Sequence, residues 1–152
     1  MGKMATYTVP FIINGEEQVA KETFEVKSPS TGELVHLCGV ATEAHANAAV
    51  EAAAAAFPAW RDVGVGARRD VILKAAELMD QRRSELEQYL IDEMGVERGW
   101  AVFNLNVTIE MIKDAAGRVS TLGGYIPKPA DPNTSAMVWR EPYGVVLAIA
   151  PW

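Results

Sequence analysis

The sequence contains one cysteine and two histidines among its 152 residues. A single thiol excludes a disulfide within the chain and fits a reducing compartment. His36 and His45 have no cysteine or carboxylate at the spacing of metal ligands, so the sequence predicts no metal site. No apolar run approaches the roughly 20 residues of a membrane-spanning helix, and the polar beginning lacks the apolar core of a secretory signal. We therefore expect a cytoplasmic protein without a membrane as partner.

Basic residues are also few. Lys and Arg number 14 against 20 Asp and Glu, which gives a net charge of −6. Nucleic acids and anionic membranes require clustered positive charge, so neither is expected as a partner. The hydrophobic share of 49% is nevertheless that of a globular protein, and 152 residues suffice for one domain with a core.

Common catalytic motifs are missing as well. The sequence has no G-x-x-x-x-G-K, no H-E-x-x-H and no G-x-S-x-G, and the stretch GVGARR at 64–69 lacks the third glycine of a dinucleotide fingerprint. Cys38 lies in the apolar stretch LVHLCGV, which favours a buried structural thiol over a nucleophile. A reactive thiol needs an electropositive and partly open site.

Short strands and turns are predicted for residues 7–40. Asn14-Gly15 is the dipeptide most typical of a two-residue hairpin. The turn SPSTGE at 28–33 places Gly32 where a positive φ is useful. Strands are expected on either side of this turn, at residues 24–26 and 34–40.

Helices are predicted for residues 42–122. Thr42 is a good N-cap for an alanine-rich helix, which Pro58 is expected to end. A second helix is predicted from about Ala67, because four apolar residues recur on one helical stripe. These are Val71, Ala75, Leu78 and Met79.

Two further helices are predicted after this one. The stretch SELE offers a capping box between Ser84 and Glu87, so a helix is expected from Glu85 until Gly95 stops it. Its apolar face would carry Leu86, Leu90 and Met94. The last helix is predicted from about Glu97 to Leu122. Its inward residues are expected to be Trp100, Phe103, Val107, Met111, Ala115 and Val119.

The chain ends in the stretch REPYGVVLAIAPW. Its apolar run, Val145–Ala150, is typical of a strand that is buried on both faces of a parallel sheet. Ligands of open α/β sheets bind at the carboxyl ends of such strands, so Pro151-Trp152 could form an aromatic wall beside a cofactor. The residues alone fit an ordinary core strand with a final tryptophan equally well.

Seven stretches of the chain carry a resemblance to one family. In order, they are FIINGE, SPSTGELV, AVEAAAAAFPAW, RRDVILKAAELM, ELEQYLIDEMG, AAGRVSTLGG and REPYGVVLAIAPW. The chain resembles the N-terminal part of NAD(P)-dependent aldehyde dehydrogenases. Its stretch TSAMVWREPYGVVLAIAPW is most similar to members that act on aromatic aldehydes such as salicylaldehyde.

The resemblance implies an α/β fold that begins the Rossmann-like NAD-binding domain. Residues 1–133 would form the N-terminal part of this domain, with strands at 7–40 and helices at 42–122. Residues 134–143 would be an oligomerisation arm strand, and residues 144–152 the first core strand of the dinucleotide-binding sheet. By the family pattern, the channel near the nicotinamide ribose is lined by Ile149, Ala150, Pro151 and Trp152.

The implied activity is oxidation of an aldehyde to its carboxylic acid with NAD or NADP. In this family an oxyanion-binding Asn follows the Pro-Trp step, and the general-base Glu and the nucleophilic Cys come much later. Cys38 matches neither the motif nor the place of that nucleophile, so no catalytic residue is assigned. We therefore expect a truncated enzyme that is inactive by itself, with little basis for cofactor binding by this chain alone.

The resemblance also implies a homo-oligomer. The strand Ala136–Arg140 would cross to a neighbouring subunit, with Met137 and Trp139 on one face. Without partner strands it would be an exposed edge. An alternative function is therefore a non-catalytic fragment that associates with full-length subunits through this arm. An incomplete gene record is a third explanation, and the aldehyde, the choice between NAD and NADP and the oligomeric state stay open.

Overall fold

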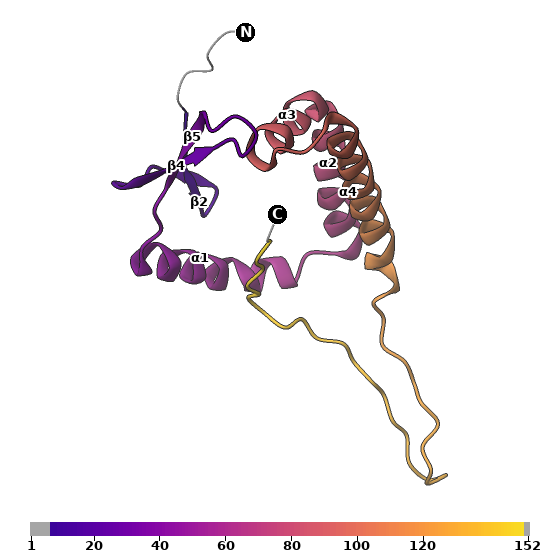
Figure 1. The fold of residues 1–152 in the computed structure, drawn as a ribbon. Helices are drawn as coiled ribbons and strands as arrows, with labels where there is room; N and C mark the ends of the chain where they lie inside the picture. Colours follow the sequence, from indigo (N-terminus) through magenta and orange to yellow (C-terminus); the bar gives the residue numbers. More distant parts are fainter. Residues whose placement is uncertain (1–6, 151–152) are drawn as a thin grey trace.

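The structure is a computed structural model that describes residues 7–150. Five short strands come first: β1 (Thr8–Val9), β2 (Phe11–Ile13), β3 (Glu16–Gln18), β4 (Thr23–Lys27) and β5 (Leu34–Gly39). Four helices follow: α1 (Glu43–Arg61), α2 (Val65–Gln81), α3 (Arg83–Met94) and α4 (Arg98–Arg118), with a 3₁₀ turn η1 at Val119–Thr121. The strands, α1 and the group α2–α4 form the sides of an open frame (Figure 1).

The strands form two small sheets. In one, β5 lies between β1 and β4, parallel to β1 and antiparallel to β4. The other is the β2–β3 hairpin, in which Asn14 and Gly15 both adopt positive φ, as the sequence predicts. The turn between β4 and β5 is also confirmed: Gly32 has a φ of 73°, and its N–H donates to the Ser28 carbonyl at 2.8 Å.

Helix α1 begins as predicted and ends later than predicted. The Thr42 hydroxyl accepts the His45 N–H, and His45 Nδ1 accepts the Thr42 N–H at 3.1 Å, which forms a reciprocal cap. The helix then continues through Pro58 to Arg61, so the expected stop is wrong. Proline removes one intrahelical hydrogen bond, but its φ is helical, and a final turn can follow. No residue of α1 is buried.

Helices α2, α3 and α4 enclose the main core. Ala76 of α2 packs against Leu105 and Ile109 of α4, and half-buried side chains from all three helices complete this cluster: Met79, Leu86 and Ile112. The side chains buried on α4 are those of Ala101, Leu105, Ile109 and Ala116. Small residues at both ends of this row allow α4 to approach its neighbours closely.

The predicted inward face of α4 is therefore wrong. Trp100, Phe103, Val107 and Met111 are 40% to 67% exposed. The stripe predicted for α2 is wrong in part: Met79 packs against the core, but Val71 and Leu78 are exposed and Ala76 is buried instead. Both helices are apolar over a wide arc, so periodicity alone did not identify the face that packs.

The start of α3 also differs from the prediction. The helix begins at Arg83 directly after α2, so Ser84 lies within its first turn and caps nothing. Glu87 is buried instead, with Arg83 at 4.0 Å and Arg98 of α4 at 3.8 Å. Through Arg98, the Glu87 carboxylate joins α3 to α4. The predicted stop is confirmed, because Gly95 ends α3 in the left-handed region with a φ of 67°.

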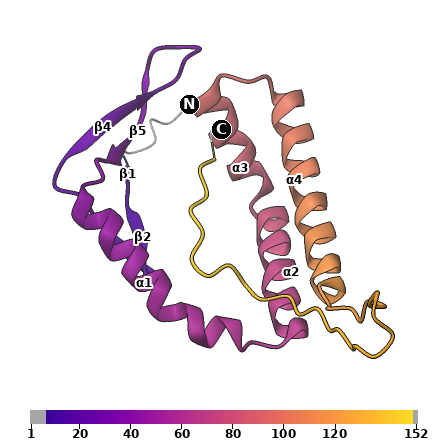
Figure 2. The ribbon, with the colours of Figure 1, turned by 90° about the horizontal axis from the view of Figure 1, so that it is seen from below.

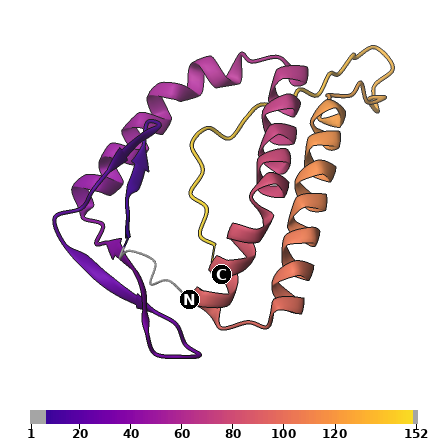
Figure 3. The same cartoon turned by 90° about the horizontal axis from the view of Figure 1, so that it is seen from above.

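The last part of the chain is extended. Within residues 122–150, one isolated antiparallel bridge joins Tyr125 to Val138, so residues 134–143 form no continuous strand. Residues 144–150 form none either, because a strand needs a neighbour for its hydrogen bonds. The assignment of residues 144–152 as the first core strand of a sheet stays a prediction. Such a strand would need a neighbouring strand from outside residues 7–150. Figures 2 and 3 show this segment running inside the frame, between α1 and α2–α3.

Among residues 7–150, no helix combines the length and the apolar composition needed to cross a membrane.

Candidate functional site

The residues predicted to line a cofactor channel lie at the end of the extended segment. Ile149 is 81% exposed and Ala150 is exposed, while Pro151 and Trp152 lie outside the described residues. Val146 and Leu147, just before them, are 72% and 84% exposed. This segment offers apolar contact and backbone hydrogen-bonding groups to a ligand. Its described side chains after Glu141 carry no charge that could bind a phosphate.

Cys38 lies on β5 and is half-buried. Burial raises the pKa of its thiol, and the negative charge of Glu93 adds to this increase. The nucleophilic form of cysteine is the thiolate, so both effects oppose catalysis. Cys38 is thus half-buried rather than buried as predicted, and the direction of its pKa disfavours a nucleophile.

His36 and Glu93 meet at the junction between the strands and α3. His36 lies on the same face of β5 as Cys38, two residues away, and its side chain is 8% exposed. Its Nε2 is 3.6 Å from Oε1 of Glu93, which lies in the last turn of α3. Among the described residues, this is the one salt bridge that joins the strands to the helices.

The end of α3 is packed closely on the turn between β4 and β5. A Cβ added to Gly95 would lie 2.7 Å from the Ser30 hydroxyl oxygen and 2.8 Å from Cγ of Pro29. Ser28 in the same turn is buried. The β4–β5 hairpin and the end of α3 thus form one junction, which carries the His36–Glu93 pair.

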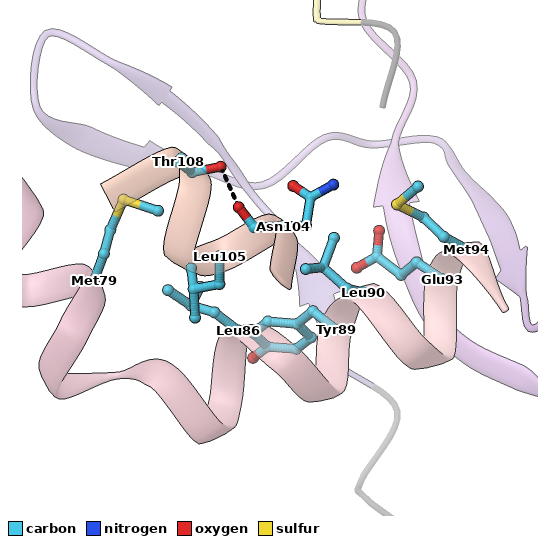
Figure 4. Close-up of a pocket in the computed structure, with 9 residues that line it drawn as sticks. All are labelled: Met79, Leu86, Tyr89, Leu90, Glu93, Met94, Asn104, Leu105 and Thr108. Atoms are coloured by element: carbon cyan, nitrogen blue, oxygen red, sulfur yellow. Dashed lines mark hydrogen bonds between the residues drawn. The ribbon is translucent and has the colours of Figure 1, made fainter. Parts of the chain in front are cut away.

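An apolar cavity of about 340 Å³ lies beside this junction, between α3 and α4 (Figure 4). Its lining is Met79, Leu86, Tyr89, Leu90, Glu93, Met94, Asn104, Leu105 and Thr108. The Thr108 hydroxyl donates to the Asn104 carbonyl at 2.9 Å, and the Tyr89 hydroxyl donates to Glu85 at 3.2 Å. Both hydroxyl groups are thereby engaged within the protein, so the lining is mainly aliphatic and thioether in character.

Sequence reasoning did not find the His36–Glu93 pair. The two residues are far apart in the sequence, and neither belongs to a motif with a defined spacing. The available signal was a histidine within an otherwise apolar strand, which needs a polar partner when it is buried. Within residues 7–150 the structure contains no group of three potential metal ligands.

The described residues thus place five short strands before four helices. The sequence profile described as "Aldehyde dehydrogenase family" matches residues 16–152. The chain therefore belongs to the aldehyde dehydrogenase family. It is 40% identical over 146 residues to vanillin dehydrogenase from Pseudomonas fluorescens, a match that covers 95% of this chain and 30% of that protein.

Solved structures agree with this assignment. The salicylaldehyde dehydrogenase from Pseudomonas putida G7, solved with salicylaldehyde, matches with a TM-score of 0.82 and 29% identity. This match covers 91% of the present chain and 29% of that one. An NAD-dependent aldehyde dehydrogenase from Sinorhizobium meliloti matches with a TM-score of 0.84 and 25% identity, over 91% and 28% of the two chains. The chain thus spans less than a third of the length of the proteins that it matches.

Proposed function

We propose that this chain forms the N-terminal part of an NAD(P)-dependent aldehyde dehydrogenase subunit that oxidises an aromatic aldehyde to its acid. The observation that carries the proposal is the match over residues 16–152 to the family, together with 40% identity to a vanillin dehydrogenase. The likeness to the salicylaldehyde dehydrogenase from Pseudomonas putida G7 also supports an aromatic substrate.

In this proposal residues 144–152 become the first core strand when neighbouring strands pair with them. The exposed side chains of Val146, Leu147 and Ile149 provide the apolar surface that such a strand would bury. The end of the strand, Ile149 to Trp152, would then contact the cofactor near its nicotinamide. Bound NAD or NADP supplies the hydride acceptor, and these residues contribute an apolar wall beside it.

The chain by itself is proposed to be inactive. Cys38 is the one thiol of the sequence, and its raised pKa disfavours the thiolate that attacks an aldehyde. Incubation of the purified chain with NAD or NADP and vanillin, salicylaldehyde or benzaldehyde tests this part. We expect no increase in absorbance at 340 nm. Reduced cofactor that forms in proportion to the chain, and that disappears in Cys38→Ser, would overturn it.

A second function, association with full-length subunits, is favoured by the shape of the arm. Residues 125–143 extend away from the frame (Figure 1). Trp139 is 76% exposed and Met137 57% exposed, whereas Ala136 and Val138, which alternate with them, are half-buried. This alternation is typical of a strand with one free apolar face. Co-purification of the tagged chain with a full-length relative tests this function. Loss of co-purification in a Met137→Lys/Trp139→Lys variant would support association through the arm. Co-purification that this variant retains would exclude the arm as the contact surface.

A further inference from the structure

The turn of the β2–β3 hairpin places an asparagine directly before a glycine, Asn14 before Gly15. The main-chain nitrogen of the residue that follows an asparagine can attack the side-chain amide, and glycine leaves this nitrogen open because it has no Cβ. Both residues are exposed, and a Cβ added to Gly15 would meet nothing within 4 Å. Packing therefore does not shield the two reacting groups.

The fold also leaves the Gly15 nitrogen without a hydrogen bond. Among the backbone hydrogen bonds of turns and loops within residues 7–150, none uses the Gly15 N–H. Both turn residues have positive φ, 55° at Asn14 and 78° at Gly15, as in a two-residue hairpin loop. A space of about 360 Å³ between this turn and the alanines of α1 is lined in part by Asn14 and Gly15. Solvent therefore reaches the turn.

We propose that Asn14 deamidates spontaneously, and that the modified turn no longer holds the strands β2 and β3 together. The Gly15 nitrogen forms a bond to Cγ of Asn14, the Cγ–Nδ2 bond breaks, and Nδ2 leaves as ammonia with the proton of the Gly15 N–H. Water then opens the succinimide ring at one of its two carbonyl carbons. Opening at the former side-chain carbonyl leaves an aspartate at position 14. Opening at the former main-chain carbonyl leaves an isoaspartate, through whose side chain the main chain now runs.

The isoaspartate product does not fit the turn. It adds one carbon atom to the main chain between Ile13 and Gly15. A two-residue loop fixes the pairing of the strands beside it, here Ile13 with Glu16, so a longer main chain disrupts the pair next to the turn. The hairpin has no third strand to compensate, and a two-stranded sheet is only marginally stable by itself.

The hairpin also contacts the start of α1, so its loosening reaches beyond the turn. The Phe11 ring lies 4.8 Å from the ring of His45, which caps α1. A Cβ on Gly39, at the end of β5, would lie 3.0 Å from Cζ of Phe11. Figures 2 and 3 show β2 beside α1. Loss of the β2–β3 pairing should therefore weaken the contacts of Phe11 with α1 and β5.

The arm contains a matched control. Asn133 is exposed in a turn, as Asn14 is, but the residue after it is Thr134. The branched side chain of Thr134 crowds its own nitrogen, and its N–H donates to the Asp131 carbonyl at 3.1 Å. Trypsin should release the peptides 4–21 and 119–140, in which Asn14 and Asn133 are the respective single asparagines. One digest therefore compares the two sites.

The test is incubation of the purified chain at pH 8 and 37 °C over several days. Replacement of NH₂ by OH should raise the mass of peptide 4–21 by about 1 Da, in two chromatographic forms. Fragmentation of the peptide assigns the change to Asn14 or to Gln18. We expect Asn14 to react at least about ten-fold faster than Asn133, which corresponds to about 1.4 kcal/mol in activation free energy. Equal rates at the two asparagines would overturn the proposal.

Amide hydrogen exchange tests the effect on the hairpin. The modified chain is separated from the fresh one by ion exchange, because it carries an added negative charge. Exchange of residues 11–18 should be at least about two-fold faster in the modified chain, with residues 101–116 as the unchanged reference. Asn14→Gly is the control variant, since two glycines adopt the positive φ of this turn and no amide remains to react. Its exchange should not change on incubation. Equal exchange of residues 11–18 in the modified and fresh chains would overturn the proposed loosening.

Discussion

Gly95 and Pro29 leave no room for a side chain between the end of α3 and the β4–β5 turn. A Cβ on Gly95 would lie 2.8 Å from Cγ of Pro29, and the φ of 67° at Gly95 belongs to the left-handed region. Glycine is required here for two independent reasons, the backbone conformation and the close approach. This close approach ties the end of α3 to the β4–β5 turn at a defined point.

Gly95→Ala should therefore destabilise the chain. We expect the free energy of unfolding to fall by about 1–3 kcal/mol, because the variant adds backbone strain and a clash at one position. Urea denaturation followed by circular dichroism measures the change. Gly117→Ala is the control, since nothing lies within 4 Å of its added Cβ and its φ is helical. Equal midpoints for the two variants would contradict the packing at Gly95.

The buried face of α4 can be tested by truncation. Leu105→Ala should lower the free energy of unfolding by about 2–5 kcal/mol, because Leu105 is 3% exposed within the main core. Met111→Ala should change it by less than about 0.5 kcal/mol, because Met111 is 67% exposed. Urea midpoints of the two variants decide the matter. A larger loss of unfolding free energy in Met111→Ala than in Leu105→Ala would show that the face predicted from the sequence is the one that packs.

Local features of the fold could be predicted from the sequence, since each depends on a few adjacent residues. The Asn14-Gly15 hairpin, the cap at Thr42 and the stop at Gly95 are of this kind. Turn and cap residues specify backbone angles directly, whatever the rest of the chain does. Ser84 shows the limit: its motif is right for a helix start, but α2 runs into α3 there and leaves no free end to cap.

Features that depend on distant partners could not be predicted in the same way. The apolar arc of α4 is wide, so the choice between Leu105 and Val107 depended on where α2 and α3 lie. His36 and Glu93 meet only because α3 packs on the β4–β5 turn. The apolar segment 145–150 reads as a strand, but pairing depends on a neighbour that no described residue supplies.

The thiol of Cys38 should react slowly. Burial and the charge of Glu93 both raise its pKa, so its thiolate is scarce at neutral pH and becomes abundant only in alkaline solution. Iodoacetamide modification should be slower than that of glutathione at pH 7.5, and its rate should continue to rise above pH 9. E93Q should slightly increase the rate of Cys38 alkylation at pH 7.5, because it removes the smaller of the two causes that raise the pKa of the thiol. Faster alkylation than glutathione at pH 7.5 would contradict this environment.

Two adjacent glycines test the arm. A Cβ on Gly124 would overlap the carbonyl oxygen of Val138, whereas one on Gly123 would meet nothing within 4 Å. Gly124→Ala should therefore break the bridge in which the Val138 N–H donates to the Tyr125 carbonyl at 2.9 Å. Amide exchange at Tyr125 and Val138 should accelerate in Gly124→Ala and stay unchanged in Gly123→Ala. Equal exchange in both variants would show that this bridge does not hold the arm.

The central claim, that these residues can serve as the N-terminal part of an aromatic aldehyde dehydrogenase, has a direct test. In a chimera, this chain replaces the matching N-terminal part of the vanillin dehydrogenase from Pseudomonas fluorescens, to which it is 40% identical. The assay follows vanillin-dependent reduction of NAD and of NADP at 340 nm, with the unmodified vanillin dehydrogenase as reference. We expect a folded chimera that oxidises vanillin within about 100-fold of the reference rate, because the exchanged part supplies scaffold rather than the nucleophile. A folded chimera of the same oligomeric state that oxidises no aldehyde with either cofactor would contradict it.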